Sequence, residues 1–212
     1  MLYLVRHAAT ENNLARPPLL QGRNANPPLS AEGHKQAAVT AVQLADLPIS
    51  AVYSSPLERA MQTGIAIAKN HNVPCQAVDE LIEADVGDWG GRTWNEIASS
   101  ETEAYQNFIS NPAEHPYAGG ENFTEVSQRT LPIFDRLLET HRGTSIAVIG
   151  HNVVNRVFLA HLAGISLAKS REIKQANCGI NVVRRRDSKN ELVTLNATFH
   201  LGADSTVSDC VR

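Results

Sequence analysis

The sequence has no long hydrophobic run, and it contains only three cysteines in 212 residues. Its first apolar stretch ends at Arg6, so it is too short for a signal peptide or a membrane-spanning helix. The cysteines form no CxxC pair and lie far apart, as is typical of reduced thiols in an intracellular protein; they are Cys75, Cys178 and Cys210. We therefore expect a cytoplasmic protein without a membrane segment.

The sequence also lacks an excess of positive charge, because its formal net charge is −3. Such a chain has no broad basic field that would attract nucleic acid or an anionic membrane, so we expect neither as a partner. If the ligand is an anion, the positive charge must instead be concentrated in a small site. Nothing in the sequence indicates an oligomeric state.

Several common motifs are absent as well. The chain contains no GxxxxGK[ST] loop for nucleotide phosphates, no GxGxxG after its first apolar run, no GxSxG and no HExxH. Its histidines and cysteines show no spacing typical of metal ligands. These absences leave the corresponding chemistries with little support.

The sequence does contain an alternation of strand-like and helix-like segments. Its length and its 42% hydrophobic content suit one α/β domain spanning residues 1–212. The patterns predict strands at 2–6, 49–54, 75–81 and 144–150, helices at 31–47, 56–71, 122–141 and 151–164, and a final strand pair at 179–186 and 191–201 joined by a turn at 187–190. This alternation predicts a mostly parallel sheet covered by helices on both faces.

Residues 83–123 interrupt the alternation. Six of the eleven aromatic residues fall in this stretch, together with several glycines. One interpretation is a helical insertion with its own small core. The other is a lid over the strand ends, aromatic enough to hold an organic leaving group. The two interpretations are compatible.

Ionisable side chains collect where the predicted strands end. Arg6 and His7 follow the first strand, His151 follows the strand at 144–150, Arg59 lies on the first turn of the helix after the second strand, and Glu83 follows the third strand. In an open α/β sheet, ligands bind outside the carboxyl ends of the parallel strands. A histidine after a buried strand is often structural, but five such groups from four distant segments favour a functional site.

These residue types suit a phosphoryl group. Guanidinium forks match phosphate oxygens and stay charged at working pH. A neutral imidazole can attack phosphorus in line and form a phosphohistidine. A glutamate that holds a proton can deliver it to the leaving alkoxide. The reaction then needs mainly positioning and positive charge.

The motifs that carry these residues resemble those of the histidine phosphatase superfamily, which includes phosphoglycerate mutases, fructose-2,6-bisphosphatases and α-ribazole phosphatases. "LVRHAAT" is similar to the family's LxRHGxT signature. Further segments resemble the family pattern in the same order along the chain; they are "PLSAEGHKQA" (28–37), "YSSPLERAMQT" (53–63), "LIEADVGDWGGRT" (81–93), "YAGGENFTEVSQR" (117–129) and "VIGHNVVNR" (148–156). The resemblance implies a three-layer α/β/α sandwich, as in phosphoglycerate mutase.

The resemblance also implies roles for individual residues. His7 would be the nucleophile that becomes phosphorylated, Arg6, Arg59 and His151 would bind the phosphoryl group, and Glu83 would be the general acid/base. Further substrate contacts are expected from Asn13, Gln21, Gly22 and Asn152. The resemblance implies no metal and no organic cofactor, and its substrates are small phosphorylated metabolites.

The sequence departs from the family pattern at a few positions. Ala8 and Ala9 follow the catalytic histidine where a glycine and often a glutamate are usual, Asn152 replaces a glycine, and Gly90 replaces a glutamate. If position 8 requires a left-handed backbone, the Cβ of Ala8 would cost energy and displace His7.

Three functions remain open on these residues. The segment 93–128 contains no lysine or arginine that could hold a second acceptor substrate, which favours water as the acceptor. We therefore predict a phosphatase that hydrolyses small phosphomonoesters through a phosphohistidine. A phosphoglycerate mutase is the alternative, and a catalytically impaired phosphate-ester-binding protein is the third possibility.

Overall fold

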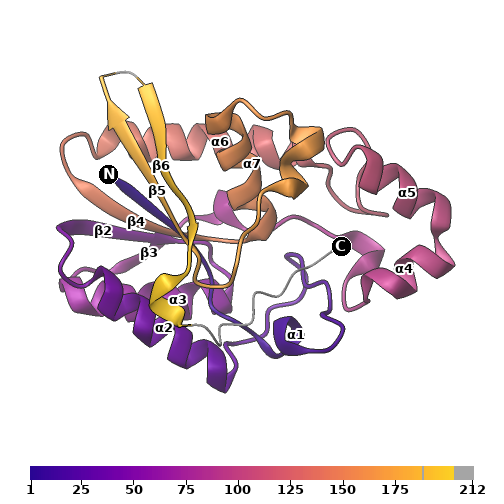
Figure 1. The fold of residues 1–212 in the computed structure, drawn as a ribbon, viewed down its shortest axis with the longest axis horizontal. Helices are drawn as coiled ribbons and strands as arrows, with labels where there is room; N and C mark the ends of the chain where they lie inside the picture. Colours follow the sequence, from indigo (N-terminus) through magenta and orange to yellow (C-terminus); the bar gives the residue numbers. More distant parts are fainter. Residues whose placement is uncertain (188, 203–212) are drawn as a thin grey trace.

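Six strands form one mixed sheet in the order β3-β2-β4-β1-β5-β6 (Figure 1). The computed structural model describes residues 1–187 and 189–202. The strands span Leu2–Arg6 (β1), Ile49–Ser54 (β2), Cys75–Ala77 (β3), Ser145–Gly150 (β4), Ile180–Arg186 (β5) and Lys189–Ala197 (β6). β1 to β4 pair in parallel, whereas the β1–β5 and β5–β6 pairs are antiparallel. The prediction of a mostly parallel sheet is confirmed.

The helices lie between these strands in sequence. The α-helices span Glu11–Leu14 (α1), Ala31–Leu44 (α2), Glu58–His71 (α3), Trp94–Ser100 (α4), Thr102–Ser110 (α5), Phe123–Thr140 (α6) and Asn152–Ala163 (α7). Short 3-10 helices occur at Asp79–Leu81 (η1), Gly87–Trp89 (η2), Leu167–Glu172 (η3) and Phe199–Leu201 (η4). The helix predicted at 122–141 forms α6, which continues across Pro132.

Helices cover both faces of the sheet (Figure 1). Leu4 points to one face, where it packs in the same cluster as Phe134 of α6. The next residue, Val5, points to the opposite face and packs with Leu44 of α2 and Ile67 of α3. Successive side chains of a strand alternate between faces, so a strand buried on both sides needs apolar residues at every position. The expected three-layer α/β/α arrangement is confirmed.

Two strands are shorter than the sequence predicts. β3 ends at Ala77, where its partner β2 ends at Ser54, and η1 replaces the rest of the predicted strand. β6 ends at Ala197, opposite the first residue of β5, Ile180. Both are edge strands, which lose their hydrogen-bonding ladder where the single neighbour ends. The predictions that these strands continue to residue 81 and to residue 201 were therefore wrong.

The hairpin between β5 and β6 is also tighter than predicted. Arg186 pairs with Lys189, so the turn is shorter than the predicted 187–190. Asp187 has a φ of 55°, in the left-handed region that aspartate tolerates in turns. Ser188 and Cys210 lie outside the described residues.

The segment 83–123 forms η2, α4 and α5, which project beside the sheet (Figure 1). Trp89 is fully buried, and its ring packs edge-on against Phe108 and Tyr117 at centroid distances of 5.5 and 5.8 Å. These rings belong to the same hydrophobic cluster as Leu4 and Phe134. The predicted helical insertion is present, but its aromatic side chains extend the main core and do not form a separate one.

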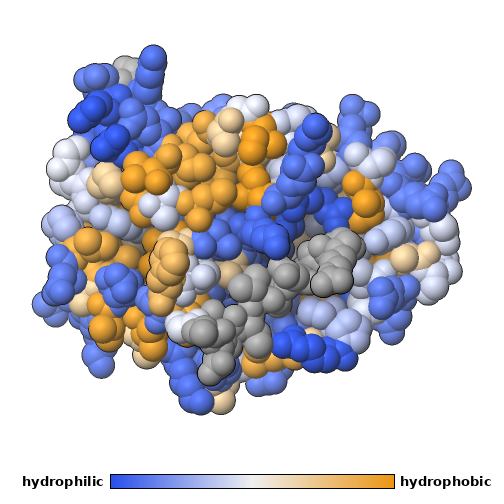
Figure 2. Space-filling model, in the orientation of Figure 1, coloured by the Kyte–Doolittle hydropathy of each residue, from blue (hydrophilic) through white to orange (hydrophobic). Residues whose placement is uncertain are grey.

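The surface around the last strand is partly apolar. Figure 2 shows hydrophobic residues gathered near β6, and Val193 and Leu195 of that strand are about half exposed. Within the described part of the chain, no helix combines the length and hydropathy needed to span a membrane.

Candidate active site

A cavity opens at the carboxyl end of β1. Its lining includes eight of the nine side chains or backbone positions that the sequence singled out; they are Arg6, His7, Asn13, Gln21, Gly22, Arg59, Glu83 and Asn152. His151 does not line the cavity: it is fully buried, and its ring lies 5.0 Å from the ring of His7. The structure therefore brings the predicted set together, with His151 next to His7.

The hydrogen bonds of His7 determine which ring nitrogen can react. Nδ1 lies 2.7 Å from the carbonyl oxygen of Ala8, which can only accept, so Nδ1 carries the proton. Nε2 then has the lone pair, and it accepts a hydrogen bond of 3.3 Å from Nε of Arg59. Burial, with the nearby charges of Arg59 and Arg6, lowers the pKa of His7 well below its ordinary value. His7 is thus a neutral imidazole with a nucleophilic Nε2.

The residues after His7 are held by side chains of α2 and α3. The N–H of Ala8 donates to Thr63 Oγ1 at 3.0 Å, and the N–H of Ala9 donates to Gln36 Oε1 at 3.0 Å. The described non-glycine residues with a left-handed backbone are Asn72, Cys178, Asp187 and Asn196. Ala8 is not one of them, so the condition under which its Cβ would displace His7 is not met.

Backbone carbonyl oxygens accept hydrogen bonds from Arg59 and Arg6. Arg59 donates to the carbonyl oxygens of Gly22 at 2.8 Å and Ala25 at 2.9 Å, and Arg6 donates to that of Gln175 at 2.5 Å. Burial lowers the pKa of Arg59 to about 10, which still leaves it charged at neutral pH. Gly22 has a φ of 56°, and a Cβ there would lie 2.5 Å from Val86, so the close approach requires glycine.

His151 forms a buried hydrogen bond with Ser55. Its Nε2 lies 2.7 Å from the hydroxyl oxygen of Ser55, which accepts the N–H of Leu57 at 3.3 Å. A serine hydroxyl can donate one hydrogen bond and accept two, so this contact is compatible with a ring proton on either nitrogen of His151. Burial, followed by the charge of Arg59, lowers the pKa of His151 well below its ordinary value. Nδ1 is buried without a hydrogen-bond partner among the described residues, and when it carries the ring proton it can donate to an anion.

Glu83 lies at the start of α7. Its Oε1 accepts from the N–H of Ala84 at 2.9 Å and of Val154 at 3.4 Å, and its Oε2 accepts from the N–H of Val153 at 3.2 Å. The first N–H groups of a helix have no partner within the helix, and they favour negative charge. The carboxyl group is thereby held at the edge of the cavity that His7 lines.

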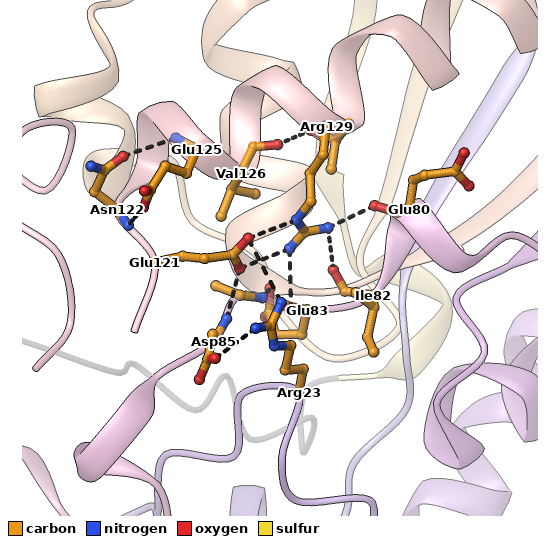
Figure 3. Close-up of polar contacts among 12 residues, drawn as sticks. Arg23, Glu80, Ile82, Glu83, Asp85, Glu121, Asn122, Glu125, Val126 and Arg129 are labelled. Atoms are coloured by element: carbon orange, nitrogen blue, oxygen red, sulfur yellow. Dashed lines mark hydrogen bonds and ion pairs between the residues drawn. The ribbon is translucent and has the colours of Figure 1, made fainter. Parts of the chain in front are cut away.

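An arginine of α6 holds the chain around Glu83 (Figure 3). Arg129 donates to the carbonyl oxygens of Glu80, Ile82 and Glu83 at 2.6, 2.7 and 3.2 Å. Its Nε forms an ion pair of 2.9 Å with Glu121, which also accepts the N–H of Asp85. We call Arg129 and Glu121 the backbone clamp. Both residues lie in the quoted segment 117–129, but their role was not predicted.

Asn13 presents its amide to the cavity. Its Oδ1 accepts from the N–H of Thr10 at 3.0 Å and lies 3.4 Å from Nδ2 of Asn177, which itself donates to the carbonyl oxygen of His7. With Oδ1 occupied, the amide NH₂ is the group that can meet a phosphate oxygen. Asn177 lies 170 residues from His7 and carried no signal in the sequence.

The rest of the cavity lining combines apolar side chains with two more arginines. The apolar members are Leu19, Leu20, Val86, Trp94, Tyr117, Phe123 and Val153, and the arginines are Arg156 and Arg171. Sequence reasoning did not select either arginine, although Arg156 ends the quoted segment 148–156. Within the described residues, no three histidine, cysteine or acidic side chains group as metal ligands would.

Comparison with known proteins agrees with this geometry. Residues 2–198 match the family model of the histidine phosphatase superfamily (branch 1). The chain is 31% identical over 202 residues to phosphoserine phosphatase 1 of Hydrogenobacter thermophilus, covering 95% of this chain and 94% of that protein. It is 34% identical over 207 residues to a metal-independent phosphoserine phosphatase of Arabidopsis thaliana, covering 95% and 83%.

A solved structure matches over nearly the whole fold. It is the phosphoserine phosphatase of Entamoeba histolytica in complex with 3-phosphoglyceric acid. The two chains superpose with a TM-score of 0.84 at 25% identity, covering 94% of this chain and 98% of the other.

Proposed function

Because this chain belongs to branch 1 of the histidine phosphatase superfamily and is a phosphatase of small phosphomonoesters, we propose that it works through a phosphohistidine on His7. The observation that carries the proposal is the neutral His7 ring, with Nδ1 bound to Ala8 and Nε2 beside Arg59. An imidazole held in this way has its lone pair in the cavity and its proton on the far nitrogen. We further propose that residues 83–123 act as a lid and that the enzyme works in the cytoplasm.

The first step transfers the phosphoryl group to the enzyme. Nε2 of His7 attacks phosphorus, the bond from phosphorus to the alcohol oxygen breaks, and Glu83, which must enter this step protonated although the N–H groups around it favour its charged form, gives its proton to that oxygen. Arg6 and Arg59 neutralise the equatorial oxygens, and Nδ1–H of His151 can donate to one of them. Each guanidinium at ~4 Å contributes roughly 4 kcal/mol at an effective dielectric of 20, before desolvation is subtracted.

The second step returns the site to its starting state. A water molecule attacks phosphorus, Glu83 takes one of its protons, and the bond between phosphorus and Nε2 breaks. Inorganic phosphate then leaves with His7 neutral again. The acid of the first step is the base of the second, so one carboxyl group serves both.

Phosphoserine is the first substrate to test. Two relatives at 31% and 34% identity are named phosphoserine phosphatases, and each is matched over 95% of this chain. The cavity lining includes apolar side chains as well as Arg156 and Arg171, so it offers both apolar surface and positive charge to the alcohol part of a small ester. We therefore propose phosphoserine, or an ester of similar size and charge, as the substrate.

A quench experiment tests the mechanism. Enzyme mixed with ³²P-labelled phosphoserine is stopped at alkaline pH, where phosphohistidine persists, and assayed for label on protein and for free phosphate. We expect transient label on His7, and His7→Ala should lose both label and turnover. His34→Ala is the control, because His34 lies exposed on α2 and should keep both. Turnover without label, or label on another residue, would contradict the phosphohistidine. In a parallel assay with 3-phosphoglycerate, isomerisation without phosphate release would indicate a mutase.

A further inference from the structure

The antiparallel ladder between β1 and β5 ends just before His7. Arg6 donates its N–H to the carbonyl oxygen of Gly179 at 3.3 Å, and its own carbonyl oxygen accepts the N–H of Cys178 at 2.9 Å. Two residues of the later segment therefore lie opposite one residue of β1, as in a β-bulge. We call residues 176–179 the bulge segment. Bulges are frequent next to active sites, where they end a ladder or turn a side chain in a new direction.

The bulge segment is held in place by β6. The carbonyl oxygen Oδ1 of Asn196 accepts the N–H of Ala176 at 2.7 Å, and a Cβ at Gly179 would lie 2.2 Å from the same oxygen. Cys178 is fully buried and has a φ of 56°, in the left-handed region that a residue with a Cβ rarely adopts. Such a conformation persists only where the surrounding structure enforces it, and it is typical of functional sites.

The bulge segment directs the side chain of Asn177 to two groups of the active site. Nδ2 of Asn177 donates to the carbonyl oxygen of His7 at 2.9 Å and lies 3.4 Å from Oδ1 of Asn13. A backbone carbonyl oxygen can only accept, so the NH₂ group of Asn177 faces His7. This NH₂ group has two hydrogens, one for each partner. Asn177 itself is buried and does not line the cavity.

The second contact bears on the orientation of the amide of Asn13. Its Oδ1 also accepts the N–H of Thr10 at 3.0 Å, and an N–H group can only donate. Donors on Oδ1 leave the NH₂ group of Asn13 on the other side of the amide, where Asn13 lines the cavity. Without Asn177, the amide of Asn13 would keep fewer of the contacts that fix this orientation.

We propose that Asn177 is a positioning residue that acts through two others. One of its hydrogens holds the backbone of His7, and the other keeps the NH₂ group of Asn13 turned toward a phosphate oxygen. The proposal rests on the proposed function for the reaction at His7. It goes beyond that function because Asn177 lies outside every motif that resembles the family pattern.

The affinity for inorganic phosphate tests the contact with Asn13. Asn177→Leu keeps the approximate shape of the side chain and removes both donors. We expect calorimetry to show an increase of about 10-fold in the dissociation constant of phosphate, as for the loss of one hydrogen bond. In an Asn13→Ala background the same substitution should cause no further increase, because both changes act through one amide. An increase of equal size in both backgrounds would overturn the role of Asn177 in orienting Asn13.

The turnover number tests the contact with His7. With p-nitrophenyl phosphate, Asn177→Leu should lower kcat about 10-fold both in the native enzyme and in the Asn13→Ala background, since the carbonyl oxygen of His7 loses its donor in each. A loss of stability alone would not divide kcat and phosphate affinity between the two backgrounds in this way. A kcat that Asn177→Leu leaves unchanged would overturn the role of Asn177 in holding His7.

Two further variants complete the test. Asn177→Ala also removes both donors but leaves a smaller side chain, so it should match Asn177→Leu, and losses that follow side-chain size would overturn the proposal. Asn70→Ala is the matched control. Asn70 lies on α3, donates its Nδ2 to the carbonyl oxygen of Ala41 at 2.9 Å and does not line the cavity. Its substitution should leave the phosphate affinity and kcat at the native values.

The phosphate measurement separates this proposal from the phosphohistidine. Binding of inorganic phosphate requires no covalent step, so the affinities can support the role of Asn177 even if the quench experiment finds no label on His7. Conversely, if His7 is labelled in the native enzyme but neither phosphate affinity nor kcat changes in Asn177→Leu, the positioning role is overturned and the phosphohistidine stands.

Discussion

The hydroxyl oxygen of Ser55 lies 2.7 Å from Nε2 of His151, although the two residues are 96 positions apart in the chain. Both side chains are fully buried. Ser55 accepts the N–H of Leu57, and its hydroxyl hydrogen is free to rotate toward His151. We expect the hydroxyl to donate to Nε2 and to keep the ring proton of His151 on Nδ1, where it can meet a phosphoryl oxygen.

Ser55→Ala should lower kcat about 10-fold, because the loss of one orienting hydrogen bond is worth roughly 1–2 kcal/mol. The proton of His151 should then distribute between both ring nitrogens, which ¹⁵N NMR of the imidazole reports. Ser54→Ala is the control, because Ser54 is equally buried but donates to the carbonyl oxygen of Ser55. An unchanged tautomer in Ser55→Ala would show that another group orients the ring.

Glu83→Gln should penalise poor leaving groups more than good ones. An alkoxide needs a proton as it leaves, whereas p-nitrophenolate does not, so we expect a loss on the order of 100-fold for phosphoserine and much less for p-nitrophenyl phosphate. Steady-state kinetics with both esters measures the difference. Glu80→Gln, an exposed carboxylate on the same segment, should affect neither ester. Equal losses on both esters would remove Glu83 from the role of general acid.

Arg129→Ala should reproduce the leaving-group dependence of Glu83→Gln in weaker form. Without the backbone clamp, the carbonyl oxygens of Glu80, Ile82 and Glu83 lose their donor, and the carboxyl group of Glu83 is less well placed. We expect about a 10-fold larger loss for phosphoserine than for p-nitrophenyl phosphate, as for a misplaced catalytic group.

A double variant distinguishes positioning from a general loss of stability. In the Glu83→Gln background, Arg129→Ala should add no further leaving-group dependence, because both changes act through the same carboxyl group. Arg136→Ala, an exposed arginine on the same helix, is the control. Independent effects of the two substitutions would refute the positioning role.

Stability should fall as the pH drops below about 6.5. The folded protein depresses the pKa of His7 and of His151, so below the ordinary histidine pKa the unfolded chain binds more protons than the folded one. Stability therefore rises with pH in that range and falls on acidification, by up to ~1.4 kcal/mol per pH unit for each histidine. Urea unfolding at pH 7.5 and 5.5 measures the difference.

His7→Gln removes one of the two titrating rings and should flatten this pH dependence. His34→Gln, which changes an exposed histidine, should leave the slope unchanged. Because the lowered pKa keeps His7 neutral, with its one proton on Nδ1, titration of that ring should not change activity as the pH rises above 7. If His7→Gln leaves the change of unfolding free energy with pH unaltered, the lowered pKa of His7 is contradicted.

Much of the site could be predicted because its key residues follow strands. The buried runs before His7 and before His151 form β1 and β4, which pair in parallel with Arg6 opposite Gly150. Parallel pairing brings both strand ends to one edge of the sheet, so the position of each histidine in the chain already implied its position in the fold. Arg59 and Glu83 followed from the same argument.

The sequence by itself determined the fold class, the residues that line the inner cavity and the family, since local hydrophobic patterns and short motifs encode all three. Only the tertiary structure decided the tautomer of His7, the backbone clamp and the place of Arg156 and Arg171 in the cavity lining. Those depend on contacts such as Asn177 with His7 and Ser55 with His151, whose partners lie 170 and 96 residues apart. No local pattern marks such a pair, because its hydrogen bond exists only once the strands and helices have packed.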